Sequence, residues 1–113
     1  MTTHEVANRL VELCRQGKIE EAQQELFADN IVSIEGPRVA EGMDAIKEKS
    51  KLFMSMVEEF HGSVISEPLI AGKYFSLAWS MDATMKERGR MNMEEICVYK
   101  VENGKIVSEQ FFF

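Results

Sequence analysis

Apolar residues recur every three or four positions in the first half of the chain and every second position in much of the second half. The helical spacing predicts three helices, within residues 4–14, 19–27 and 43–57. Thr2 and Glu5 have the spacing of a capping box, so the first helix should begin beside Thr2. A short β-rich run, residues 31–35, ends at Gly36 and Pro37 and separates the second helix from the third.

The alternation after residue 60 predicts a meander of antiparallel strands. Turns at Gly72, Gly89 and Gly104 separate these strands. Helices followed by a meander predict an α+β fold, in which the three helices pack on one side of a curved antiparallel sheet. The expected partner of the third helix is the nearly unbroken apolar strand face Phe75, Leu77, Trp79, Met81, Ala83 and Met85. A length of 113 residues is that of one domain, residues 1–113.

The type of each turn decides which side chains share the apolar face. If each glycine closes a type I turn with a G1 bulge, four inward-facing pairs are predicted across the sheet: Trp79–Cys97, Met81–Glu95, Cys97–Glu109 and His61–Met81. A two-residue turn at any of these glycines would instead shift the pairing by one residue and exchange the two faces. The bulged alternative is preferred because it gathers the apolar residues on one face.

Composition and charge exclude several function classes. A net charge of −6 and a pI near 5.0 argue against nucleic acid, whose phosphates require a basic surface. No run approaches the ~20 apolar residues of a membrane span, and no secretory signal is expected. Cys14 and Cys97 lack the spacing of a metal site, so both are interpreted as reduced core thiols of a cytoplasmic protein, and no metal is expected.

Candidate chemistry lies in four ionisable residues. Glu95 and Glu109, on an apolar face, would have raised pKa values and could act as general acid and base; one register shift would instead leave them in solvent. His61 could shuttle protons, or be a strand histidine bonded to a backbone carbonyl. Glu35 lies at the exit of the first strand, where a solvated side chain is the ordinary alternative to a functional one.

An adaptable apolar lining for a pocket would come from Trp79, Met81, Met93, Cys97, Tyr99 and Phe111. The alternative for these positions is ordinary core. On the third helix, the run Lys47, Glu48 and Lys49 is predicted to face water.

Residues 26–30 (LFADN) leading into a short strand, together with residues 95–113, resemble the SnoaL-like group of the NTF2-like superfamily. The resemblance implies a cone-shaped α+β barrel with a pocket between the helices and the concave sheet, and frequent homodimers packed through the sheet. It also implies carboxylate acid–base chemistry on a small apolar carbonyl compound, as in polyketide cyclases and isomerases, without a cofactor. The alternative is a non-catalytic protein of this superfamily that binds a hydrophobic ligand or forms a dimeric scaffold.

The resemblance carries over to catalytic positions only in part. Glu35 matches the place of the proton-abstracting carboxylate of ketosteroid isomerase. Leu10 and Cys97 stand roughly where that enzyme has its two oxyanion donors, a tyrosine and a protonated aspartate, so steroid isomerisation is not expected. Glu95 is the nearest match to the acid/base aspartate of the polyketide cyclases. In this enzyme hypothesis Glu35 or Glu95 is the base, and Glu109, His61 or Tyr99 donates to the oxyanion.

Overall fold

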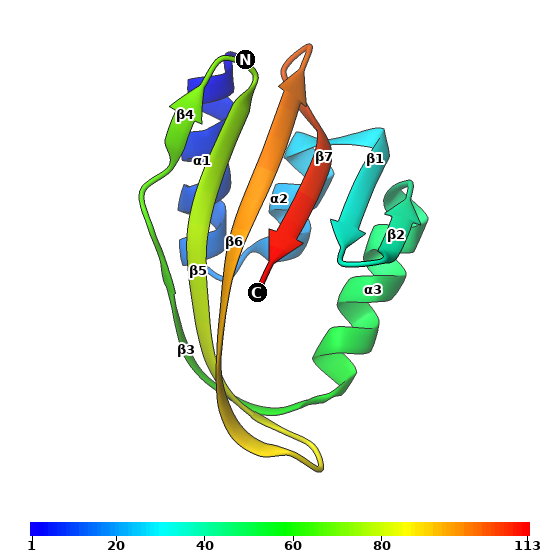
Figure 1. Ribbon diagram of the computed structural model, residues 1–113, viewed down its shortest axis with the longest axis vertical. Coiled ribbons are helices and arrows are strands. Elements are labelled where there is room, and N and C mark those ends of the chain that lie inside the picture. Colours follow the sequence, from blue (N-terminus) through cyan, green and yellow to red (C-terminus); the bar gives the residue numbers. More distant parts are fainter.

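The computed structural model describes all 113 residues and consists of three helices packed against one curved sheet (Figure 1). The elements follow in the order α1 (Thr3–Arg15), α2 (Ile19–Leu26), β1 (Phe27–Glu35), β2 (Arg38–Glu41), α3 (Met43–Ser55), β3 (Val57–Ile65), β4 (Leu69–Ala71), β5 (Tyr74–Met85), β6 (Gly89–Glu102) and β7 (Lys105–Phe112). The predicted α+β fold is confirmed. None of the helices is long and apolar enough to cross a membrane.

The strands form one open sheet in the order β2-β1-β7-β6-β5-β3, with β4 also paired to β5. The prediction of a fully antiparallel sheet is wrong at one place, because β1 and β7 pair in parallel. The β1–β2 hairpin and α3 lead to β3 at the opposite edge of the sheet. From there β5, β6 and β7 follow one another back across the sheet, so that β7 lies beside β1 and runs parallel to it. The first and last strands therefore lie side by side at the centre of the candidate site.

The helices cover the sheet unequally. α1 begins with the predicted capping box, in which the Thr2 hydroxyl accepts from the Glu5 N–H at 3.1 Å and the Glu5 carboxylate accepts from the Thr2 N–H at 2.9 Å. α1 packs on β3, β4 and β5, whereas α3 packs mainly on β1 and β2 and buries only Ile46. The prediction that α3 covers the apolar face of β5 is therefore wrong at the β4 end of that strand, which α1 covers.

The buried core lies between α1, α2 and the sheet, and the rings of Phe75 and Tyr99 stack in it at 4.7 Å. Cys14 and Cys97 are buried and free in this core. The long β5–β6 hairpin extends past the end of α3 and curves beneath it (Figure 1). The outer, even-numbered face of the sheet leaves several apolar side chains exposed, among them Val64, Ile96 and Phe112.

The β5–β6 hairpin has the predicted faces but not the predicted pairs. Met85 lies opposite Gly89, so Trp79 pairs with Glu95 and Met81 pairs with Met93. The predicted pairs Trp79–Cys97 and Met81–Glu95 are wrong by two residues. A shift of two keeps every side chain on its face, because the side-chain period of a strand is two.

The β6–β7 hairpin closes with the two-residue turn that was expected to exchange the faces. Asn103 and Gly104 both have positive φ, at 51° and 75°, as a type I′ turn requires. A register shift between Lys100 and Val101 then restores the alternation. Beyond this bulge Tyr99 lies opposite Glu109, which faces inward as predicted although its predicted partner Cys97 was wrong.

A glycine substitution tests the turn. Gly104→Ala is expected to destabilise the protein by more than the roughly 1–2 kcal/mol of a left-handed residue, because a Cβ there would lie 3.0 Å from the backbone nitrogen of Met1. Gly72→Ala is the matched control, since Gly72 also has positive φ but open space around it. Urea unfolding measures both; an equal loss in the two variants would contradict the assigned contact.

Candidate functional site

Three acidic side chains on neighbouring strands approach one another on the inner side of the sheet. Glu35 ends β1, Glu109 lies in β7 and Glu95 lies in β6. Their mutual repulsion contributes to raising the pKa values of Glu95 and Glu109. Together with the other acidic, histidine and cysteine residues they form no group that could hold a metal ion. Carboxyl groups with raised pKa values can exchange protons closer to neutral pH than solvated ones.

Glu109 is the most deeply buried of the three, with 6% of its surface exposed. Burial raises the pKa of its carboxyl group to about 7, and the charges of Glu95 and Glu35 act in the same direction. A hydrogen bond from Ser33 and the positive charge of Lys49 oppose this rise. Glu109 thus has both protonation states available near neutral pH, which suits a general acid or base.

Glu95 is half-buried, and this burial is the main cause of its raised pKa. The thiol of Cys97, two residues along the same face, donates to Glu95 Oε1 at 3.6 Å and opposes the rise. The charges of Glu35 and Lys49 act in opposite directions on Glu95. Both Glu95 and Glu109 thus lie on the inner face of the sheet, as the sequence predicted.

Lys49 is the site residue that sequence reasoning missed, because the prediction that it faces water is wrong. Its Nζ donates to Ser33 Oγ at 3.1 Å, lies 3.8 Å from Glu35 Oε2 and sits 4.5 Å from the centroid of the Phe111 ring. Position 49 follows Ile46 by three residues and precedes Phe53 by four, so it shares their side of α3. This spacing could have indicated that Lys49 lies on the buried side of α3.

The predicted apolar lining divides into an outer and an inner part. Met81 and Met93 face each other across β5 and β6 and are half-buried, and Phe111 and Trp79 are also half-buried. The indole nitrogen of Trp79 is buried without a hydrogen-bond partner. The remaining two predicted lining residues, Cys97 and Tyr99, are almost fully buried. Burial raises the pKa values of their thiol and hydroxyl groups, so both remain neutral.

His61 lies outside this group, and its predicted pairing with Met81 is wrong. The register of β3 against β5 shifts between Phe60 and Gly62, and His61 occupies this irregularity. Its side chain is exposed, with Nε2 2.7 Å from Thr84 Oγ1, on the outward side of β5. Ser63 takes the place opposite Met81 instead. The extra residue in β3 turns His61 away from the carboxyl groups.

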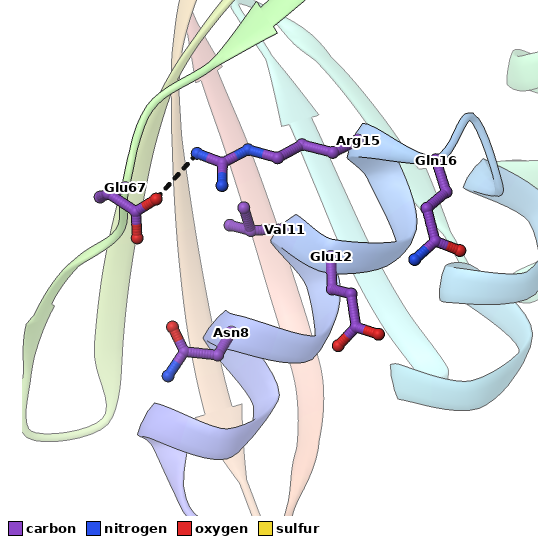
Figure 2. A pocket seen from close by; sticks show the side chains of 6 residues that line it. All are labelled: Asn8, Val11, Glu12, Arg15, Gln16 and Glu67. Atoms are coloured by element: carbon purple, nitrogen blue, oxygen red, sulfur yellow. Dashed lines mark ion pairs between the residues drawn. The ribbon is translucent and has the colours of Figure 1, made fainter.

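A shallow hollow on the solvent side of α1 lies apart from the carboxyl groups (Figure 2). It is mostly polar, and Arg15 crosses it to pair with Glu67 at 3.0 Å. Arg15 also donates to the carbonyl oxygen of Ile65 at 2.8 Å. These contacts tie the end of α1 to the segment between β3 and β4, which is a structural role.

Comparison with known proteins gives a consistent family result. The family described as the SnoaL-like domain matches residues 1–113. A crystal structure from Mesorhizobium loti, provisionally named a SnoaL-like polyketide cyclase, is 35% identical over 100% of both chains, with a TM-score of 0.94. Among curated proteins, none matches this chain significantly.

More distant structures share the fold alone. An NTF2-like protein of unknown function from Burkholderia pseudomallei is 13% identical, with a TM-score of 0.81 over 100% of this chain and 92% of that one. A protein from Catenulispora acidiphila with a ketosteroid isomerase-like fold, solved with trimethylamine, is 16% identical, with a TM-score of 0.75 over 92% of this chain and 84% of that one.

The raised pKa of Glu109 predicts how stability depends on pH. The folded carboxyl holds its proton between pH 4.5 and about 7, where the unfolded one loses it, so the free energy of unfolding should fall as pH rises through this window. The loss should be on the order of 3 kcal/mol, at about 1.36 kcal/mol per pKa unit. Glu109→Gln should remove most of this slope and be more stable than wild type at pH 8.

Urea unfolding at pH 5 and pH 8 measures this effect. Glu48→Gln, at an exposed position of α3, is the matched control and should keep the wild-type slope. An unchanged slope in Glu109→Gln would show that Glu109 is solvated.

Proposed function

The chain belongs to the SnoaL-like domain family, and on this premise we propose that it binds a small apolar carbonyl compound in the cone and moves a carbon-bound proton of that compound. The observation that carries the proposal is the buried carboxyl group of Glu109, whose pKa of about 7 lies at working pH. Such a base is half ionised near neutrality and strong enough to take an acidic proton next to a carbonyl group. The product would be an isomerised or cyclised compound.

The carboxyl groups would divide the work. Glu109, ionised in part of the population, acts as the base. Glu109 then returns the same proton to another atom of the substrate, and the neighbouring charge of Glu95 helps to keep the pKa of Glu109 high enough for both steps. The Glu35 side chain is only 27% exposed, and its ion pair with Lys49 offsets part of the positive charge that Lys49 brings to the site. No metal or cofactor enters these steps.

The apolar lining would select the substrate. Trp79, Met81, Met93 and Phe111 are half-buried on the inner side, so a ligand can displace water from them. Cys97 and Tyr99 form the closed end of this lining, because both are almost fully buried. A small, mainly apolar compound with one reactive carbonyl fits this distribution.

A second candidate function is binding without turnover. The deep burial of Glu109 favours it, because a substrate atom must reach a group with only 6% of its surface exposed. In that case the cone stores or senses a hydrophobic molecule. The two buried free thiols suit either function in the reducing cytoplasm.

We further propose a homodimer packed through the outer face of the sheet. Ile96 and Phe112 lie opposite each other on β6 and β7 and are 46% and 50% exposed, and Val64 is 70% exposed on β3. An exposed apolar stripe on a sheet is typical of an interaction surface. A second copy of the same face would cover it symmetrically.

Proton–deuterium exchange into cyclic ketones and β-dicarbonyl compounds tests the reaction. Wild type is expected to catalyse exchange on at least one compound, and Glu109→Gln should lower the rate at least a hundredfold because it removes the base. Glu95→Gln should have a smaller effect. Glu48→Gln, on the exposed side of α3, should leave the rate unchanged. Saturable ligand binding without exchange in wild type would instead support the binding protein.

Sedimentation velocity tests the dimer. Wild type at micromolar concentration should sediment as a dimer, and Ile96→Asp should sediment as a monomer because it places a charge in the apolar stripe. Leu52→Asp, at an exposed apolar position of α3, is the control and should remain dimeric. A monomeric wild type would contradict the proposed interface.

A further inference from the structure

Lys49 has an unusual position for a lysine on an amphipathic helix. Its neighbours Lys47 and Lys51 are exposed, but the Lys49 side chain is only 34% exposed and turns toward the ends of β1 and β7. Removing an ammonium group from water is unfavourable unless polar partners replace the water. The contacts of Lys49 therefore show which of its hydrogen-bond donors remain free for a ligand.

The partners of Lys49 leave part of its hydrogen-bonding capacity unused. An ammonium group has three N–H donors, and only Ser33 Oγ, at 3.1 Å, accepts at hydrogen-bond distance. Glu35 Oε2 at 3.8 Å is too distant for a direct hydrogen bond, although its charge attracts the ammonium. The face of the Phe111 ring, whose centroid lies 4.5 Å from Lys49 Nζ, attracts the cation but provides no acceptor atom for a hydrogen bond.

Trp79 provides a second unused donor on the same inner side of the sheet. Its indole nitrogen is buried and has no acceptor in the protein. Trp79 lies directly opposite Glu95 in the β5–β6 pairing, and Glu95 is one of the carboxyl groups that senses the charge of Lys49. The indole nitrogen is not accessible from the solvent, so Lys49 is the accessible donor of the two.

We propose that Lys49 is the anion-recognising group of this site, so that its ammonium group binds a ligand oxygen that carries or develops negative charge. This inference rests on the proposed function and narrows its substrate class to compounds whose oxygen becomes an enolate or phenolate. By the resemblance to ketosteroid isomerase, Leu10 and Cys97 stand roughly where that enzyme has its two oxyanion donors, and neither side chain is a strong donor. Lys49 comes from a different element, α3, and supplies that role with a full positive charge.

Two small probes separate charge recognition from apolar binding. 4-Nitrophenol ionises near neutral pH, whereas 4-nitroanisole has the same ring and cannot ionise. Calorimetry at pH 8 is expected to show that wild type binds the phenolate more tightly than the anisole. In Lys49→Met this preference should fall about tenfold or more, as the loss of a charge-assisted hydrogen bond predicts.

Matched variants make the result specific to position 49. Lys47→Met removes an exposed charge from the same helix and should keep the wild-type preference, and Lys49→Arg should retain most of it. A second measurement uses wild type alone, in case Lys49→Met does not fold. The visible absorbance of bound 4-nitrophenol should show that the site holds the phenolate form at a pH where the free probe is mostly protonated.

Three outcomes would overturn the inference: an unchanged phenolate preference in folded Lys49→Met, a bound probe that stays protonated in wild type, or no saturable binding of the phenolate. These failures differ from failure of the proposed reaction. Phenolate recognition through Lys49 without proton exchange would support the inference and leave a binding protein. Proton exchange that does not depend on Lys49 would support the reaction and remove Lys49 from it.

Discussion

The removal of one carboxyl group from water is the constraint on which the site depends. Glu109 lies on the inner side of β7, and burial raises its pKa to about 7 against the opposing effects of Ser33 and Lys49. Ionising this group inside an apolar lining is unfavourable. The same cost lowers the stability of the fold above neutral pH and, in the proposed function, gives the site a base that is active there. Stability and chemistry are therefore linked through one side chain.

Most of the fold could be predicted from the sequence, because side-chain periodicity reports directly on burial. The capping box at Thr2, the helical stripes and the alternation along β5 all appear in the structure. The parallel pairing of β1 with β7 could not be predicted from local patterns, because it depends on how the hairpin and α3 return the chain across the sheet. Contacts between distant segments are set by topology rather than by periodicity.

The candidate site was predicted at the level of faces but not of pairs. The predicted inward faces of Glu95 and Glu109 were right although the pairs were wrong. The error in the β5–β6 register was two residues, which keeps every face, and the bulge beside Lys100 compensated for the unexpected turn between β6 and β7. His61 was misplaced because the register of β3 shifts beside Gly62, and the bulge that an isolated glycine in a strand can indicate was not considered. Lys49 was missed because a charged residue in a charged run resembles a solvated surface, although its spacing from Ile46 shows the buried side of α3.

The central claim is that Glu109 titrates in a dry, inward-facing environment. Carbon-13 NMR of the glutamate side-chain carboxyl groups, assigned with Glu109→Gln, measures that titration without a substrate. We expect the resonance of Glu109 to titrate with a midpoint near pH 7. A midpoint for Glu109 near 4.5 would contradict the account, because the carboxyl group would then be in contact with bulk water.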